Sequence, residues 1–260
     1  MNRRVLFCAI VLLTGSMAAP AGSLDPLHSR CYISTDEDSG RFRIYIPSGD
    51  CEESRHCGSD FSNDSLDRLT GITRGDLERE GTNLTATLAA EAGTFTCSGT
   101  VHDGELAGRS VFTPDQGFLD RMQHMGFSGY DSEKLMAYAV MDVTSKWVQS
   151  MQQAGVRGMK VDNLLALRIF RVDPDYIHSL TSMGYEMPDA DKLIALKVQG
   201  VNVDEVRQIR GLGYQPTLDE LIQIRIFHIT PDFIRRMQDR GLKNLTIGKL
   251  VQIRIFKLDE

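Results

Sequence analysis

A glycine recurs at a nearly constant interval through the second half of the chain. The intervals are 29, 29, 29 and 28 residues, between Gly126, Gly155, Gly184, Gly213 and Gly241. Each glycine follows a group of apolar residues and precedes a second apolar run, which begins at Leu135, Leu164, Leu193, Leu221 and Leu250. A period between about 20 and 50 residues is typical of stacked structural repeats. Arrays of such repeats mostly bind other molecules rather than transform them. Residues 113–260 are therefore predicted to form an array of five repeat units.

Each unit carries the sequence signals of two helices, A and B, joined by a short loop. A side chain that can accept hydrogen bonds at a helix start precedes helix A in every unit, at Asp115, Thr144, Asp173, Asn202 and Thr230. The recurring glycine falls where a left-handed residue ends helix A. Helix B has its own capping residues at Asp131, Asp189, Thr217 and Thr246, with Lys160 as the exception. The units are predicted to be α-helical hairpins.

The apolar residues of helix B cover a broad arc. In the second unit they are Leu164, Leu165, Leu167 and Ile169, followed by Val172. Such an arc predicts a helix that is packed on two sides. A single hairpin cannot bury this face, so the units are expected to stack as a short α-solenoid.

The segment before the repeats alternates polar and apolar residues, as half-buried strands do. Four strands are predicted, over residues 41–46, 83–88, 94–101 and 108–112. Asp103-Gly104 lies between the last two and suits a tight hairpin turn. Two short helices are expected around 65–69 and 74–80. The chain is thus predicted to be α+β, with a small β-rich module over residues 22–112 and the helical array over 113–260.

The first 21 residues have the features of a signal peptide. Arg3 and Arg4 precede a short apolar run, and Ala19-Pro20-Ala21 supplies the small residues of a cleavage site. An uncleaved anchor is the alternative. No later segment reaches about 18 apolar residues, so the mature chain is not expected to span a membrane. The predicted localisation is periplasmic or extracellular.

Four cysteines remain after the signal peptide, at Cys31, Cys51, Cys57 and Cys97, all in the β-rich module. An even number of cysteines in an oxidising compartment predicts two disulfides, with three pairings open. A zinc site at Cys51, Cys57 and His56 is the alternative, but its spacing is loose. Neither a metal nor a cofactor is predicted.

Charge is unevenly distributed along the chain. Residues 23–111 hold 16 acidic and 8 basic side chains, whereas residues 112–260 hold 19 of each. No basic surface of the kind that binds nucleic acid is expected. The acidic run Asp36-Glu37-Asp38 only partly matches a calcium loop and is better explained as a solvated turn.

One polar position recurs in helix B. Arg168, Lys197, Arg225 and Arg254 lie four residues after the first Leu of their helices. One interpretation is a row of cations that contacts an acidic partner. The other is that each cation complements the dipole in the last turn of its helix.

The last unit ends in apolar residues, including Ile255, Phe256 and Leu258. A terminal repeat normally presents a polar outer face. We therefore expect this end to be covered, either by a second copy in a homodimer or by a partner that contacts Phe256.

The repeats resemble tandem helical units of exported or membrane-anchored bacterial proteins. The likeness lies in Thr230-Pro231-Asp232-Phe233-Ile234 through Gly241, then in Leu250-Val251-Gln252-Ile253-Arg254-Ile255, and in Gly93-Thr94-Phe95-Thr96-Cys97-Ser98-Gly99 running into Phe112-Thr113-Pro114. It covers about residues 84–260 and is nearest to the extracytoplasmic C-terminal tails of beta-lactamase-sensor-type membrane metallopeptidases. The His-Glu-x-x-His of a peptidase is absent from this sequence. The resemblance implies a bacterial extracytoplasmic setting.

No catalytic signature stands out in the sequence. The six histidines show no metal spacing, and there is no Gly-x-Ser-x-Gly, phosphate loop or dinucleotide fingerprint. We predict a non-enzymatic interaction or scaffold protein of the cell envelope that binds a protein or peptide through its repeats. The alternatives are an envelope sensor that binds a small ligand or cation in the N-terminal module, and a hydrolase in the same module.

Overall fold

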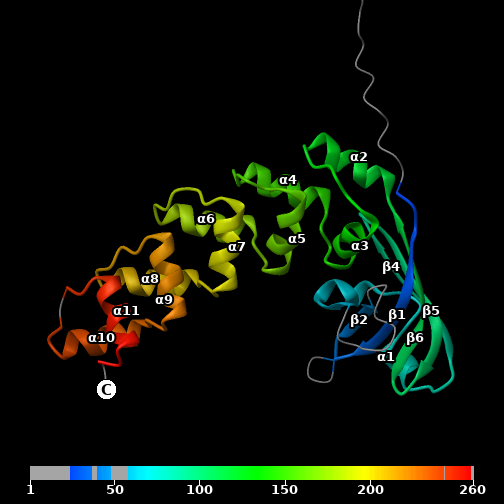
Figure 1. Ribbon diagram of the computed structural model, residues 1–260, viewed down its shortest axis with the longest axis horizontal. Helices are drawn as coiled ribbons and strands as arrows, with labels where there is room; N and C mark the ends of the chain where they lie inside the picture. The colour runs from blue at the N-terminus through cyan, green and yellow to red at the C-terminus, as the bar shows by residue number, and fades with distance from the viewer. Residues whose placement is uncertain (1–23, 37–39, 48–57, 243, 259–260) are drawn as a thin grey trace, which may run out of the picture.

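The computed structural model describes residues 24–36, 40–47, 58–242 and 244–258. The described chain is α+β, as predicted: a six-stranded antiparallel sheet is followed by a run of helices that extends away from it (Figure 1). The predicted signal peptide lies outside the described residues, as do Cys51, His56 and Cys57.

The strands follow the order β3-β2-β1-β6-β5-β4. Their bounds are β1 Leu27–Thr35, β2 Phe42–Pro47, β3 Gly58–Ser62, β4 Asn83–Ala90, β5 Gly93–His102 and β6 Glu105–Pro114. β2, β4, β5 and β6 overlap the four predicted strands. The Asp103-Gly104 turn between β5 and β6 has positive φ at both residues, 50° and 76°, as a tight hairpin requires.

Two strands were not predicted. β3 lies at the edge of the sheet, and four of its five residues are exposed, so it carries little hydrophobic alternation. β1 buries Cys31 and Ile33 but also turns Ser29 inward, which weakens the pattern. The two expected helices are a 3-10 helix, η1 (Asp64–Arg68), and α1 (Arg74–Leu77), which is shorter than predicted.

A disulfide joins Cys31 on β1 to Cys97 on β5, across the intervening strand β6. The two Cα atoms are only 6.0 Å apart. Beside the bridge, Gly99 on β5 and Gly108 on β6 let these two strands approach closely, because a Cβ on Gly108 would lie 2.1 Å from the carbonyl oxygen of Ser98. The structure thus selects one of the three pairings for these two cysteines.

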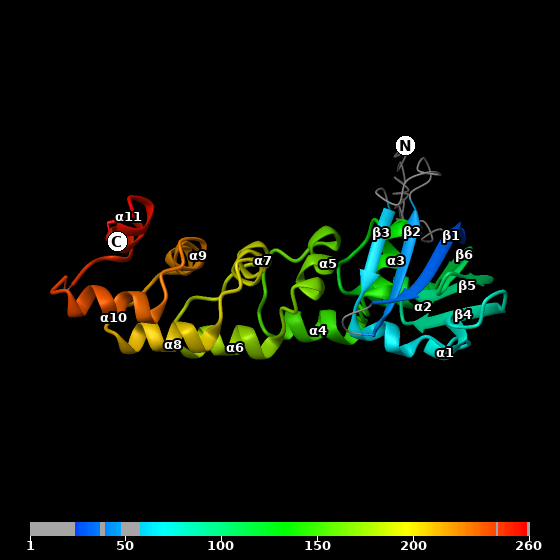
Figure 2. The same cartoon turned by 90° about the horizontal axis from the view of Figure 1, so that it is seen from below.

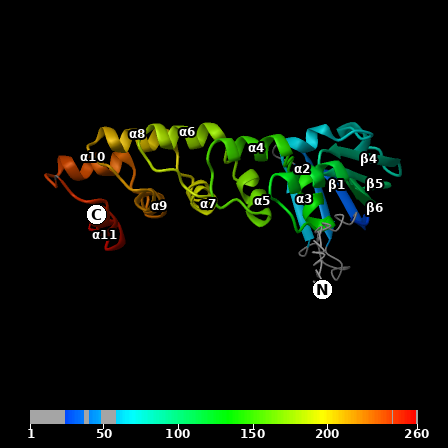
Figure 3. The same cartoon turned by 90° about the horizontal axis from the view of Figure 1, so that it is seen from above.

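Ten helices follow the sheet in the described residues, and each is nine residues long. The A helices are α2 Gln116–His124, α4 Ser145–Gln153, α6 Pro174–Ser182, α8 Val203–Gly211 and α10 Pro231–Asp239. The B helices are α3 Ser132–Val140, α5 Val161–Ile169, α7 Ala190–Val198, α9 Leu218–Ile226 and α11 Ile247–Ile255. A helices contact neighbouring A helices and B helices contact neighbouring B helices, so α4 to α11 form two rows (Figures 2 and 3).

The first helix pair attaches the rows to the sheet. α3 packs on β4, β5 and β6. Beside it, the carboxylate of Glu91 at the β4–β5 turn accepts hydrogen bonds from the Ser145 N–H at the start of α4, at 2.8 Å, and from Arg121 on α2, at 2.9 Å. A carboxylate at a helix N-terminus is also favoured by the helix dipole. The helices therefore begin in a fixed position relative to the sheet.

The predicted helix ends are confirmed. All five capping residues of the A helices accept a hydrogen bond from a backbone N–H in the first turn, and so do the four of the B helices. At the exception, Lys160, the side chain of Asn163 instead accepts from the Lys160 N–H at 2.8 Å. The five periodic glycines all have positive φ, between 84° and 92°.

Helix B packs against neighbouring B helices on two sides, as α7 does against α5 and α9, but its apolar arc is wider than its buried face. Leu164 and Leu167 are fully buried, whereas Leu165 is only partly buried and Ile169 is exposed. The buried side faces the A row and the neighbouring B helices. The far side is left with apolar residues that no described part of the chain covers.

Candidate interaction surface

The four recurring cations of helix B have intramolecular partners. Arg168 Nε donates to the carbonyl of Met141 at 3.3 Å, Arg225 Nε to Gln199 at 3.2 Å, and Arg254 Nη2 to His228 at 3.3 Å. Each acceptor lies within two residues after the B helix of the preceding pair. The cations thus complement the negative end of the preceding helix, in addition to the last turn of their own.

The same cations lie against aromatic rings of helix A in their own pair. The distance to the ring centroid is 5.6 Å from Arg168 to Trp147, 4.5 Å from Lys197 to Tyr176, and 4.1 Å from Arg254 to Phe233. Helix α8 has Glu205 at this position instead of an aromatic residue, and Arg225 forms an ion pair with it at 2.7 Å. The four cations therefore connect neighbouring helices, and their contact with a partner stays a prediction.

Ion pairs also run along the start of the B row. Lys134 Nζ lies 2.6 Å from Asp162, and Lys192 pairs with Asp219 in the same way two helices further on. The hydrogen bond between Lys134 and Asp162 raises the pKa of Lys134 and lowers that of Asp162. This edge of the row therefore carries alternating charges of both signs.

An apolar residue is exposed at one equivalent position in four successive B helices. It is the last residue of the helix, and 46% of Ile169 and 51% of Ile255 are exposed; the four members are Ile169, Val198, Ile226 and Ile255. We call this set the B-row stripe. In α3 the equivalent residue is Val140, which is buried where α3 packs on the sheet. The stripe thus begins where contact with the sheet ends.

Phe256, the predicted partner residue at the C-terminal end, is 67% exposed. It directly follows the last member of the B-row stripe. Leu242 and Leu258 are also exposed at this end of the helical rows. Sequence reasoning identified Phe256 but missed the stripe, because the apolar spacing of helix B was interpreted as core.

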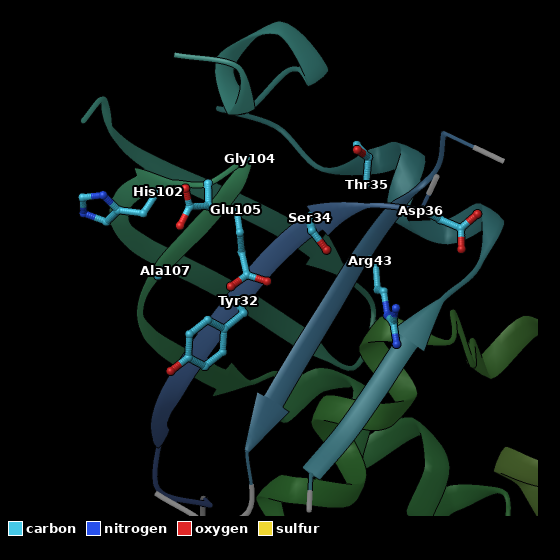
Figure 4. Close-up of a pocket in the computed structure, with 10 residues that line it drawn as sticks. Tyr32, Ser34, Thr35, Asp36, Arg43, His102, Gly104, Glu105 and Ala107 are labelled. Carbon is cyan, nitrogen blue, oxygen red and sulfur yellow. The ribbon is translucent and has the colours of Figure 1, made fainter. Parts of the chain in front are cut away.

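A hollow of about 820 Å³ lies on the face of the sheet that α3 does not cover (Figure 4). Tyr32 and Ser34 on β1, Arg43 on β2 and Glu105 on β6 contribute to its lining. The ring of Tyr32 lies beside that of Tyr45, tilted by 36°, with ring centroids 6.0 Å apart. The Arg43 guanidinium donates to both oxygens of Asp60, which raises the pKa of Arg43. The lining is polar, and two of its side chains, Arg43 and His102, each contact a carboxylate.

At the rim of this hollow, the ring of His102 forms a hydrogen bond with a carboxylate. His102 Nδ1 lies 2.7 Å from Glu80 Oε1, and the Asp103 N–H donates to Glu80 Oε2 at 3.0 Å. The hydrogen bond with His102 is the main cause of a lowered pKa at Glu80. These contacts hold the β5–β6 turn against the segment after α1.

Two properties of the described residues bear on metals and membranes. Their His, Cys, Asp and Glu side chains form no group of three that could hold a metal ion. None of their helices has the length and apolar character needed to cross a bilayer.

Comparison with family models, curated proteins and solved structures finds no match to this chain. The resemblance to metallopeptidase tails therefore stays a prediction.

Proposed function

We propose that this chain is an exported, non-enzymatic interaction protein of the bacterial cell envelope. Its helix pairs form a short α-solenoid, and a helical segment of a partner protein binds across the B row. The observation that carries the proposal is the B-row stripe, an exposed apolar residue at the same position in four successive helices. Contiguous exposed apolar surface on a soluble protein commonly marks an interaction site.

The spacing of the stripe favours a helical partner. Packed helices lie about 8–10 Å apart, so successive members of the stripe have about that separation. Seven residues of an α-helix rise about 10.5 Å. A partner helix that crosses the B row with apolar residues in a heptad pattern would therefore place one of them near each member of the stripe. An extended strand would alternate its side chains between two faces at this spacing.

The charges of the array favour apolar rather than ionic recognition. Residues 112–260 carry equal numbers of acidic and basic side chains. Arg168, Arg225 and Arg254 donate to carbonyl groups of neighbouring helices, so their capacity for a partner is reduced. The binding should depend only weakly on salt, whereas recognition by the cations would be screened.

The disulfide supports export. Disulfides persist in oxidising compartments such as the periplasm and are rare in the cytosol. The Cys31–Cys97 bridge agrees with the predicted signal peptide at residues 1–21.

Site-specific photocrosslinking tests the proposal. A benzoylphenylalanine replaces Val198 or Ile226, and as a control Arg207 on the exposed side of α8. We expect the same envelope protein to be captured at 198 and 226 but not at 207. Equal capture at all three positions would contradict binding at the stripe.

The captured protein is then purified and its affinity measured. Burying the exposed half of each apolar side chain is worth about 1 kcal/mol. Val198→Ser with Ile226→Ser is therefore expected to weaken binding about tenfold or more, whereas Arg207→Ser with Arg235→Ser leaves it unchanged. Binding that falls steeply with salt and is lost in Arg168→Gln, Lys197→Gln, Arg225→Gln and Arg254→Gln would instead assign recognition to the cations.

An envelope sensor is the second candidate, and the hollow beside Tyr32 and Arg43 is the observation that favours it. A rise in the melting temperature of the chain with calcium or an envelope sugar, abolished by Tyr32→Ala, would support this function. The same rise in the Tyr32→Ala variant would place the ligand elsewhere.

A further inference from the structure

Two arginines at the end of α5 bind two aspartates in the part of the molecule that carries the sheet. Arg171 Nη2 lies 3.3 Å from Asp64 at the start of η1, and Arg168 Nη2 lies 3.1 Å from Asp142, which follows α3. Both aspartates are fixed relative to the sheet, because η1 contacts β2 and β4 and α3 packs on β4, β5 and β6. We call these four residues the ionic joint. They connect the second helix pair to the sheet and to the first pair.

Each aspartate of the joint is also bound by an arginine on the sheet side. Arg41, just before β2, lies 2.6 Å from Asp64, and Arg68, at the end of η1, lies 3.0 Å from Asp142. Each carboxylate therefore lies between two guanidinium groups, one from either side of the joint. The arginine on the sheet side orients the carboxylate that the end of α5 binds.

The first junction of the B row differs from the later ones. The residues equivalent to Asp142 are Arg171, Gly200 and His228, so the cation of the next B helix meets no carboxylate at that position. In return, α5 packs on α7, α7 on α9 and α9 on α11, and the contact between α3 and α5 is smaller than any of these. The first junction therefore depends more on charged side chains, and the later junctions depend more on packing.

The ionic joint lies at the surface, so solvent and salt weaken its contacts. Arg168 and Asp142 are 33% and 30% exposed, and Arg171 and Asp64 are 73% and 60% exposed. Salt screens ion pairs at such positions. The apolar packing of α3, which buries five of its nine residues, is not screened in this way. A small and polar contact between two parts of a chain normally permits relative motion between them.

We propose that the ionic joint is a salt-sensitive switch that sets the direction of the helical rows. While the joint is closed, the rows hold one direction relative to the sheet. When it opens, the second to fifth pairs swing together away from η1, and the first pair stays on the sheet.

The swing has a pivot at the starts of α4 and α5. The start of α4 stays attached because the Ser145 N–H donates to Glu91 at 2.8 Å. The start of α5 stays attached because the Tyr138 hydroxyl donates to the Val161 carbonyl at 2.7 Å. The B-row stripe begins at Ile169 on α5, so the joint sets the direction of the whole stripe. The proposal does not rest on what binds there.

Distances between two spin labels in the full chain test the proposal. A keto amino acid carries one label at Thr94 on β5 and one at Asp239 on α10, both of which are exposed, and leaves the cysteines unmodified. Double electron–electron resonance should give a narrow distance distribution at about 20 mM salt, and a broader or shifted one at about 1 M salt, where the Debye length is about 3 Å. Arg168→Gln with Arg171→Gln should give the broader or shifted distribution already at low salt.

A second pair of labels and a matched variant locate the motion. Labels at Asp175 on α6 and Asp239 on α10 both lie within the rows, so the distance between them should be the same at low and high salt. Arg79→Gln with Arg207→Gln removes two exposed ion pairs outside the joint, one in the sheet-bearing part and one in α8, and should behave as the wild type. Helical content measured by circular dichroism should be the same in all variants.

Three results would overturn the proposal. The first is a distance between the sheet and α10 that stays unchanged at high salt, or in Arg168→Gln with Arg171→Gln. The second is a change of the same size between the two labels within the rows, because the rows themselves would then bend. The third is a broad distribution in the control variant at low salt. If Arg168→Gln with Arg171→Gln lost helical content, the response of the wild type to salt would decide on its own.

Discussion

Five residues hold a left-handed backbone conformation at the ends of the B helices, and one of the five is glycine. Their φ angles lie between 51° and 67°; the residues are Asp142, Arg171, Gly200, His228 and Lys257. This conformation allows the next residue to donate to the carbonyl five positions back, as Val172 does to Leu167 at 2.9 Å. A side chain with a Cβ is strained in this region. The hydrogen bonds at the helix end therefore stabilise the left-handed conformation even where the residue is not glycine.

His228→Gly should stabilise the protein by about 0.5–1 kcal/mol, because it removes the Cβ from a left-handed residue. The reverse change at the equivalent position, Gly200→Ala, should destabilise it by about 1 kcal/mol. Urea unfolding followed by circular dichroism measures both. If the two changes shift stability in the same direction, the backbone conformation is not what matters at this position.

At the scale of helices and strands, the sequence predicted those features that depend only on residues close together in the chain. The capping residues Asp115 and Thr144 and the periodic glycines identified helix starts and ends, because each acts on backbone groups within a few residues. The left-handed residues after the B helices carry no glycine signal except at Gly200, so the sequence did not indicate them. β3 was not predicted for a different reason, since an exposed edge strand needs no alternation of polar and apolar residues.

The site was harder to predict than the helices. The position of Arg168 repeats in the sequence, but its acceptor belongs to the preceding helix pair. That contact depends on how two helices pack and leaves no trace in the spacing of residues. The B-row stripe could not be predicted for the same reason. The spacing of apolar residues indicates which side chains can be buried, but not whether another part of the chain covers them.

Removing one junction contact should measure how strongly neighbouring helices are coupled. Arg168→Gln loses the ion pair with Asp142 and weakens the hydrogen bond to Met141. The guanidinium is one-third exposed, so solvent screens the pair, and we expect a loss of about 1 kcal/mol. Arg207→Gln is the control, because Arg207 pairs within its own helix with the exposed Asp204, and it should change stability by less than about 0.5 kcal/mol. Equal effects in urea unfolding would mean that Arg168 does not couple the helices.

At the scale of the whole molecule, the sheet supports the helical rows, and the disulfide holds the sheet. Cys31 and Cys97 are fully buried and 66 residues apart in the sequence. Cys31→Ala with Cys97→Ala should destabilise the protein by about 4 kcal/mol, the loop-closure value for that separation. The difference between wild type and variant is measured by urea unfolding without reductant. A difference below about 1 kcal/mol would show that the bridge contributes little beyond the packing of the sheet.

The length of the two helical rows sets the distance between the sheet and the last helix pair. Helices in each row follow one another at about 10 Å, so the fifth pair lies about 40 Å from the first pair, which packs on the sheet. Such a molecule could span two attachment points at once, and its reach would change in steps of one helix pair as pairs were gained or lost.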